Sequence, residues 1–309
     1  MSRIALVRAP NPSALTLSGT NSYVIDCGGG IAFVLDPGPL IASHIHALSE
    51  NARSRGLRIA AIGVTHGHPD HAPAAAALAE KTGAPVYAHP HSDVPHDRDF
   101  ALDDDLAIGT SVLRVIDAPG HTFEHVALYE PQERALFTGD VILGEGTVVI
   151  APPGGAMRPY IATLHRLRRE FPAAERIYGG HGEIVEDARA KIAEYIAHRE
   201  QRERELLTVL RNGPATIPEL VATIYTSVNP ILWPAAARQM LAYLIPLTEE
   251  GVVSAERLDR ELTREETAIL NPAWESIVGA EHAPLVEAEL GAMLKLDHVY
   301  RYTLTSRAT

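Results

Sequence analysis

The stretch VTHGHPDHAPA, residues 64–74, contains within six positions four side chains of metal-binding type: His66, His68, Asp70 and His71. It continues an almost wholly apolar run, LRIAAIGV (57–64), which predicts a buried strand covered on both faces. The first two histidines follow the end of that strand, and Asp70 and His71 are expected near the start of the next helix. Clustered polar side chains cost stability unless a partner satisfies them. Imidazole and carboxylate groups suit Zn²⁺ and related divalent ions, so the stretch predicts a metal site.

Three further ligand-type residues stand in corresponding places: His121, Asp140 and His181. Each follows the carboxyl end of a predicted strand and is preceded by glycine. Open α/β sheets place their ligand sites at that edge, and glycine lets the backbone turn sharply and leaves space beside a ligand. Seven ligand-type residues from four loops exceed what one tetrahedral ion needs, which indicates two ions.

Strands and helices alternate from the start of the chain to about residue 200. Short apolar and β-branched runs with Gly and Pro between them predict strands. The ranges 39–56 and 72–83 have helical composition and stop at Gly56 and Gly83. This alternation predicts an α/β layered domain over residues 1–200.

Residues 201–309 predict a smaller, mainly helical domain. A long charged helix covers about 187–213, a short helix follows with Thr216 or its neighbour as its cap, and a third runs through 233–251. The strand-like runs VVSAE and HVYRYTLTS come after them. Three helices followed by a strand pair are typical of a winged-helix domain. Residues 255–295 do not fit a compact wing, and their fold and role stay open.

The composition limits the partners. The formal net charge is −12, and an acidic surface does not attract nucleic acid or anionic membrane over long range. The third helix of the small domain offers only Arg238 as a cation, so DNA binding by the winged helix is not expected. One cysteine, no signal-peptide core and no membrane-length apolar run lead us to expect a cytoplasmic protein without a membrane partner. The oligomeric state, a homo-oligomer included, stays open.

In their order along the chain, four motifs resemble those of the metallo-β-lactamase superfamily: H-x-H-x-D-H (66–71), G-H-T (120–122), G-D (139–140) and G-H-G (180–182). The resemblance implies an αββα sandwich with a dinuclear metal site along one edge. It assigns His66, His68 and His121 to a first ion and Asp70, His71 and His181 to a second, with Asp140 bridging both. Zinc is the expected metal, although iron and manganese accept the same ligands.

A narrower resemblance is to the β-lactamase-like protein 2 branch of that superfamily. It rests on NPSALTLSGTNSYVI (11–25), GEGT (144–147) and the C-terminal winged helix. Members of the branch in animals act on single-stranded RNA, so the resemblance implies phosphodiester hydrolysis, with a short RNA or a small molecule as substrate. The loop 148–160 carries extra Pro and Gly, so the loop over the site is expected to differ from the branch.

The expected reaction is hydrolysis. Two neighbouring cations lower the pKa of a shared water, and the resulting hydroxide attacks an electrophilic centre. Asp70 is expected to bind metal and to orient this nucleophile. His125 is interpreted as a proton donor, as a support for a metal ligand or as a packed strand residue. Arg158 is a candidate contact for a phosphate, with a solvated helix face as the alternative interpretation. The same site would serve a thioester, a lactone or a β-lactam. The similar persulfide dioxygenases use a related motif with one iron.

Five other histidines are predicted to lie outside the site. His44 and His46 are interpreted as surface residues of the helix in 39–56. His89, His91 and His96 fall in a Pro- and Asp-rich segment, which predicts a solvated loop.

Overall fold

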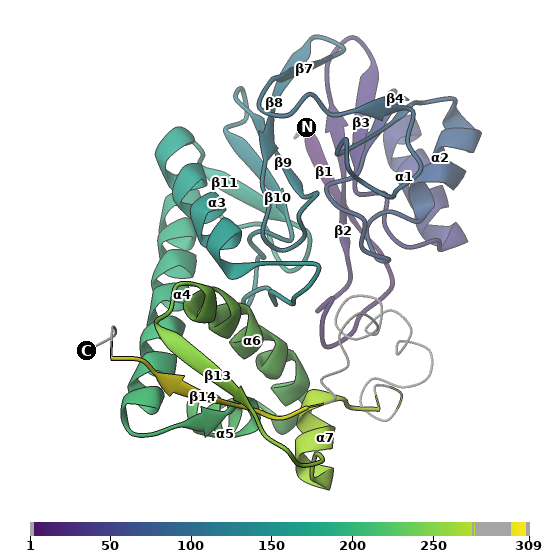
Figure 1. Ribbon diagram of the computed structural model, residues 1–309. Helices are drawn as coiled ribbons and strands as arrows, with labels where there is room; N and C mark the ends of the chain where they lie inside the picture. The colour runs from purple at the N-terminus through teal and green to yellow at the C-terminus, as the bar shows by residue number, and fades with distance from the viewer. Residues whose placement is uncertain (1–2, 274, 276–297, 307–309) are drawn as a thin grey trace. The chain divides into compact units, whose positions relative to one another are not determined.

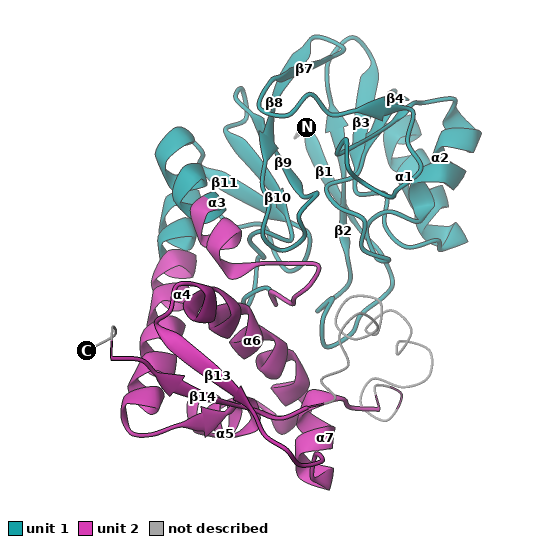
Figure 2. Cartoon of the chain, viewed as in Figure 1, with its two compact units in different colours: residues 1–148, 163–193 teal, residues 149–162, 194–309 magenta. Residues whose placement is uncertain are grey.

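The computed structural model describes residues 3–273, 275 and 298–306. The chain divides into two compact units (Figure 2). The first comprises residues 1–148 and 163–193, and the second comprises residues 149–162 and 194–309. The final crossing lies near the boundary predicted at residue 200. The chain also enters the second unit earlier, at 149–162, a segment that the sequence assigned to the first domain.

The first sheet of unit 1 has six strands, in the order β1 (Ile4–Arg8), β2 (Asn21–Asp26), β3 (Ile31–Leu35), β4 (Arg58–Gly63), β5 (Val86–Ala88) and β6 (Arg98–Asp99). The first three strands pair antiparallel, and the pairings from β3 onward are parallel. The second sheet has five strands, in the order β11 (Arg176–Gly179), β10 (Ala135–Gly139), β9 (Val126–Glu130), β8 (Ser111–Asp117) and β7 (Asp105–Ile108).

The two sheets share a core because side chains alternate along each strand. Phe33 and Leu35 of β3 pack with Leu128 and Phe137 of the second sheet in one apolar cluster. The residues between them, such as Val34, face a second cluster that includes residues of the helices α1 (Ala42–Ser54) and α2 (Ala74–Thr82). The first sheet is therefore covered on both faces, as its apolar strands predict.

Helices lie on both outer faces of the sheet pair (Figure 1). On the side of the second sheet, unit 1 contains the end of α3 (Met157–Glu170) and the start of α4 (Ala188–Arg211). Leu164 and Leu167 of α3 are fully buried. The predicted αββα sandwich is confirmed. The helix α2 stops at Gly83, whose φ of +70° is the left-handed C-cap that the sequence predicts.

Unit 2 contains most of α4, then α5 (Ile217–Ile224), the short 3₁₀ helix η1 (Pro230–Leu232), α6 (Trp233–Glu249) and α7 (Arg264–Leu270). Its strands β12 (Ala215–Thr216), β14 (Tyr300–Leu304) and β13 (Val253–Arg257) form one antiparallel sheet in that order. Thr216 caps α5 through a reciprocal pair of hydrogen bonds with Glu219, as predicted. The winged-helix prediction is confirmed. Of the segment 255–295, residue 274 and residues 276–295 lie outside the described residues.

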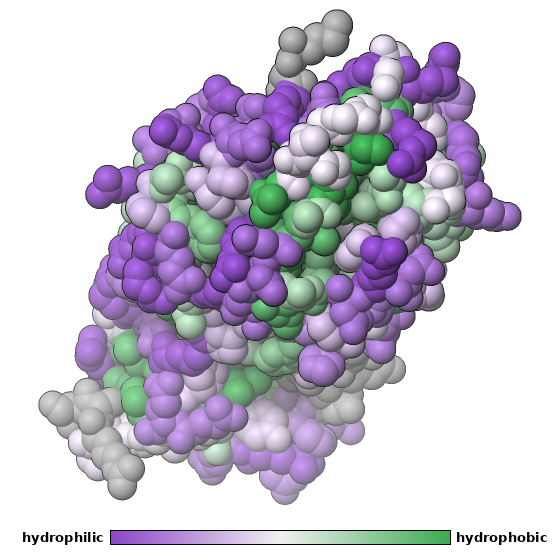
Figure 3. Space-filling view, turned by 90° about the horizontal axis from the view of Figure 1, so that it is seen from above, coloured by the Kyte–Doolittle hydropathy of each residue, from purple (hydrophilic) through white to green (hydrophobic). Residues whose placement is uncertain are grey.

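Hydrophilic side chains dominate the face shown in Figure 3, with a smaller apolar area between them. Within the described part of the chain, no helix combines the length and the apolar character needed to cross a membrane.

Candidate metal centre

The seven ligand-type residues come together at one edge of unit 1. The loop after β4 carries His66, His68, Asp70 and His71, and the loops after β8, β10 and β11 carry one residue each. These side chains form two groups whose ligand atoms lie within 4.8 Å of one another: His66, His68, His121 and Asp140 in the first group, and Asp70, His71 and His181 in the second. The sequence prediction that the strand ends converge is confirmed.

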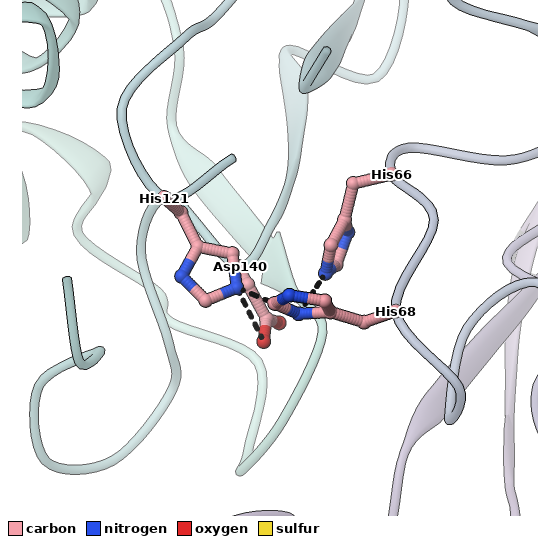
Figure 4. A group of neighbouring side chains, drawn as sticks. All are labelled: His66, His68, His121 and Asp140. Atoms are coloured by element: carbon pink, nitrogen blue, oxygen red, sulfur yellow. Dashed lines mark hydrogen bonds and ion pairs between the residues drawn. The ribbon is translucent and has the colours of Figure 1, made fainter. Parts of the chain in front are cut away.

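The first group is built around the ring of His68 (Figure 4). Its Nδ1 lies 3.0 Å from Nε2 of His66 and 3.0 Å from Nε2 of His121. The carboxylate Oδ2 of Asp140 lies 3.7 Å from Nε2 of His121. All four side chains direct a donor atom toward one point.

The second group is buried more deeply, since none of its three residues is more than 3% exposed. Oδ2 of Asp70 lies 3.3 Å from Nε2 of His71 and 3.3 Å from Nε2 of His181. The two imidazole nitrogens are 3.4 Å apart. The three atoms therefore form a nearly equilateral triangle.

These distances fit divalent metal ions. Bonds of about 2.0–2.1 Å from zinc to nitrogen or oxygen place tetrahedral ligands about 3.4 Å apart. The six separations given above, 3.0 to 3.7 Å, scatter around that value, and all ligand atoms of each group lie within 4.8 Å of one another. Both groups consist of imidazole and carboxylate, ligands that zinc, iron and manganese accept.

Asp140 belongs to both groups. Its Oδ1 lies 3.4 Å from Nε2 of His71, and its Oδ2 lies 3.4 Å from Nε2 of His181 as well as near His121 in the first group. The carboxylate is therefore within reach of both groups, with Oδ2 lying between His121 and His181, which is compatible with the bridging position that the resemblance implies for Asp140.

The two groups carry different charges. Burial and neighbouring histidines hold the pKa of His66 well below its usual value and lower the pKa of His68 to about 3, so these rings are neutral, as metal binding requires. In the second group, burial alone would lower the pKa of His71, but the carboxylates around it raise the pKa well above its usual value. The same balance raises the pKa of His181 to about 10. A metal ion entering the second group must displace these protons.

A further carboxylate, Asp36, supports the centre from behind. Its side chain accepts hydrogen bonds from the backbone N–H of Thr65 at 2.7 Å and from the Thr65 hydroxyl at 2.8 Å. Its Oδ2 also lies 3.0 Å from Nδ1 of His71, so it orients that ring with Nε2 toward the second group. Asp36 was not among the residues predicted from the sequence.

His125 also lies behind the ligands. It is fully buried, its ring stacks on His66 at 4.7 Å, and its Nε2 accepts the backbone N–H of Asp140 at 3.1 Å. Of the three interpretations of His125, this geometry favours support of a metal ligand, because Nε2 is already engaged as an acceptor.

Gly180 keeps the centre open. A Cβ at this position would lie 2.2 Å from Oδ1 of Asp140 and 2.6 Å from Cε1 of His71. Any side chain at residue 180 would collide with these two ligands, so Gly180 leaves space beside them, as expected from the sequence.

Comparison with known proteins agrees with this geometry. Residues 15–181 match the family described as the metallo-beta-lactamase superfamily, and residues 216–260 match the beta-lactamase associated winged helix domain. The chain belongs to the metallo-beta-lactamase superfamily. It is thus a metal-dependent hydrolase by family, as predicted.

Two relatives within the superfamily match more than three quarters of the chain. The "Beta-lactamase-like protein 2 homolog" of Caenorhabditis elegans is 33% identical over 251 residues, which cover 79% of this chain and 83% of the relative. The protein of the same name from Drosophila melanogaster is 32% identical, with coverage of 78% and 86%. The predicted likeness to that branch is confirmed.

Solved structures of the superfamily show the same fold. A metallo-beta-lactamase family protein from Thermus thermophilus superposes with a TM-score of 0.66 at 24% identity, covering 82% of this chain and 96% of that one. A beta-lactamase domain protein from Burkholderia ambifaria gives a TM-score of 0.69 at 22% identity, with coverage of 83% and 89%.

Arg158 lies in unit 2, at the start of α3, and is already paired. Its guanidinium donates four hydrogen bonds of 2.7 to 3.1 Å to the carboxylates of Glu203 and Glu250. Its positive charge is neutralised there, which argues against the phosphate contact predicted for it.

Two of the histidines predicted to be solvated are buried. His44 is 2% exposed, because the side of α1 that carries His44, Leu48 and Ala52 packs inward, and its Nε2 lies 2.8 Å from the hydroxyl of Ser22. His89 is 4% exposed, and its Nδ1 accepts the backbone N–H of His91. The surface interpretation of these two residues was wrong.

Proposed function

We propose that the chain is a dinuclear, zinc-dependent hydrolase that cleaves phosphodiester bonds of single-stranded RNA. The observation that carries the proposal is Asp140, whose two carboxylate oxygens lie 3.4 Å from His71 and from His181 while the same side chain also reaches His121. One carboxylate shared by two complete ligand groups supports two ions rather than one. The substrate class follows from the resemblance to the β-lactamase-like protein 2 branch.

Two bound divalent ions would supply a water of lowered pKa and positive charge where the transition state develops negative charge. The residues of this chain would do the rest. His66, His68 and His121 would hold one ion, and Asp70, His71 and His181 the other. With Oδ2 of Asp70 turned to the second group, its Oδ1 is the oxygen that would accept a hydrogen bond from the attacking water and orient it.

The composition and burial of α6 argue against DNA recognition by unit 2. In a DNA-binding winged helix, α6 would be the recognition helix, which reads bases through exposed polar and basic side chains. Its basic residue, Arg238, is only 2% exposed. We propose that this unit does not bind DNA.

The test is cleavage of a labelled single-stranded RNA by zinc-loaded protein, beside the variants Asp70→Asn and, as a matched control, Asp93→Asn on an exposed loop. The proposal expects cleavage by the wild type and the control, and a loss of at least about a hundredfold in Asp70→Asn, the lower end for a positioned catalytic group. Absence of cleavage by protein shown to carry its metals would contradict the substrate assignment.

A carbonyl substrate is the second candidate, favoured by the net charge of −12 and by the neutralised Arg158. A thioester, a lactone and a β-lactam are the compounds to assay on the same protein. Turnover of one of them without RNA cleavage would replace the RNA proposal and leave the metal chemistry in place. One bound iron with consumption of oxygen would instead indicate a dioxygenase.

A further inference from the structure

The N-terminal segment 9–21, APNPSALTLSGTN, folds into a compact loop beside the second ligand group. Its ends are joined by a hydrogen bond from the N–H of Ala9 to the carbonyl of Thr20 at 2.8 Å. Gly19 closes the loop at a φ of +120°, and a Cβ there would lie 2.1 Å from the carbonyl oxygen of Ala9. We call this segment the Thr20 loop. No step of the proposed reaction uses it.

The hydroxyl of Thr20 reaches the metal centre. Its Oγ1 lies 2.6 Å from Oδ2 of Asp70, the oxygen that also faces His71 and His181. Thr20 is fully buried and Asp70 is 2% exposed, so water does not compete for this bond. A short hydrogen bond to an ionised carboxylate is among the stronger hydrogen bonds in proteins, and this one is shielded from water.

The direction of this hydrogen bond is fixed by Asn11. The Oδ1 of Asn11 accepts the backbone N–H of Thr20 at 2.9 Å, which leaves the Nδ2 amide group to donate to Oγ1 of Thr20 at 3.0 Å. A threonine hydroxyl has one proton, and with Oγ1 accepting from Asn11 that proton is directed to Asp70. The two hydrogen bonds therefore run in one direction: the Asn11 amide donates to the Thr20 hydroxyl, and this hydroxyl donates to the Asp70 carboxylate.

The Thr20 loop also holds the strand end that carries His181. The N–H of Asn21 donates to the carbonyl of Gly180 at 2.7 Å, and its side-chain amide donates to the carbonyls of Gly179 and Gly182 at 3.0 and 2.9 Å. Two members of the second group are therefore positioned by one loop. The first group has other supports: Oγ1 of Thr65 lies 3.0 Å from Nδ1 of His66, and His125 accepts the N–H of Asp140.

We propose that Thr20 is a positioning residue for the second metal ion: its hydroxyl, oriented by Asn11, fixes Oδ2 of Asp70 toward His71 and His181 and so sets the affinity of that ion separately from the first. This inference rests on the proposed two-ion function. Groups that orient metal ligands typically change metal affinity by about 10–100-fold when removed, and the expected effect falls on one of the two ions.

The experiment is a stepwise titration of metal-free protein with Co²⁺, followed by its absorption spectrum, for the wild type, Thr20→Val and Thr20→Ser. Valine keeps the shape and removes the hydroxyl, whereas serine keeps the hydroxyl. We expect two binding steps in the wild type. In Thr20→Val the step that fills the second ligand group, here called the second step, should weaken about 10–100-fold while the other step is unchanged, and Thr20→Ser should restore it.

Two further variants separate this role from a general loss of packing. Thr163→Val is the matched control, because Thr163 is also buried and its hydroxyl donates to the carbonyl of Pro119, outside the second group. It should leave the second step unchanged. Asn11→Asp keeps Thr20 but offers its hydroxyl a competing carboxylate, so it should weaken the second step as Thr20→Val does, and it serves if the valine variant does not fold.

The outcomes are distinct. A second step that is unchanged in both Thr20→Val and Asn11→Asp, or that weakens equally in Thr163→Val, would overturn the role of Thr20 while leaving the two-ion proposal intact. A wild type that binds one Co²⁺ only would overturn the two-ion proposal itself, and this inference with it.

Discussion

The backbone N–H of Asp140 donates a 3.1 Å hydrogen bond to Nε2 of His125. The residue whose carboxylate reaches both ligand groups is therefore positioned, through its backbone, by a histidine that is not among the seven ligands. The ring of His125 is fully buried and stacks on His66, which places it on the core side of the ligands. The pKa of His125 is held well below its usual value by burial and by His121, so the ring is neutral and can accept this bond.

This relationship predicts the behaviour of His125→Phe. Phenylalanine keeps a ring against His66 but cannot accept the Asp140 N–H, so metal affinity should fall about 10–100-fold. The pH dependence of the hydrolysis rate should keep its shape in fully loaded protein, because His125 supplies no proton. Metal content and pH–rate profiles measure both effects. Loss of one limb of the profile with normal metal content would show instead that His125 acts as a proton donor.

A methyl group at residue 180 should reduce metal binding at the centre. The Cβ of Gly180→Ala would lie 2.2 Å from Oδ1 of Asp140, so either the carboxylate or the backbone must move. Gly67→Ala is the matched control, since its Cβ would meet the nearest atoms at an ordinary 3.5 Å although it lies within the His66–His71 motif. We expect the purified Gly180→Ala protein to hold fewer metal ions than the control. Equal metal content in the two variants would refute the steric argument.

Asp36→Asn should loosen the second ion. Asparagine can still accept from Thr65, but its amide N–H₂ would face Nδ1 of His71 in place of a carboxylate oxygen, which no longer favours the tautomer with a free Nε2. Release of zinc to a chelator should accelerate about 10–100-fold. Asp26→Asn is the control, because Asp26 ends another strand and its side chain accepts the backbone N–H of Gly28, and it should release zinc at the wild-type rate. The same release rate from both variants would disprove the role of Asp36.

Arg158→Ala should affect stability rather than catalysis. The change removes the ion pairs with Glu203 and Glu250, which are partly exposed and together contribute about 1 kcal/mol. The thermal midpoint should fall slightly, and the KM for RNA should stay the same. Arg168→Ala, on the exposed side of α3, provides the baseline. A raised KM with an unchanged midpoint would restore the phosphate contact predicted from the sequence.

His44 should make folding sensitive to acid. Burial lowers the pKa of His44 from 6.5 to about 4 in the folded chain. On acidification the unfolded chain therefore takes up a proton at His44 before the folded chain does. The contribution of neutral His44 to the free energy of unfolding is complete above pH 6.5 and is lost as the pH falls from 6.5 to 4. In this range the folding constant should fall by at most about tenfold per pH unit. His44→Gln removes this contribution. Urea midpoints of chelator-treated wild type and variant should converge or cross on acidification, whereas parallel curves would contradict the assignment.

Much of the centre could be predicted from the sequence because its ligands follow strand ends. His66, His121, Asp140 and His181 each stand one to four residues beyond a strand, and the carboxyl ends of neighbouring strands meet at one edge. The burial of His44 was also within reach, since His44, Leu48 and Ala52 repeat at helical spacing and mark one face of α1.

The supports of the ligands could not be predicted in the same way. Asp36 follows a strand within LDPG, a pattern typical of a turn, and its contact with His71 spans 35 positions. Thr20 and Asp70 are 50 positions apart. Such pairs become visible only when the sheet brings distant loops together. Residues 149–162 likewise belong to unit 2 because of tertiary contacts between distant parts of the chain. One of these contacts is the hydrogen bond from the N–H of Ile150 to the side chain of Gln239.

The most direct test of the two-ion account is a crystal structure of the zinc-loaded protein with anomalous diffraction measured at the zinc edge. The account predicts two anomalous peaks about 3.5–4 Å apart, one among His66, His68 and His121, the other among Asp70, His71 and His181, with Asp140 touching both. A single peak, or peaks away from Asp140, would contradict it.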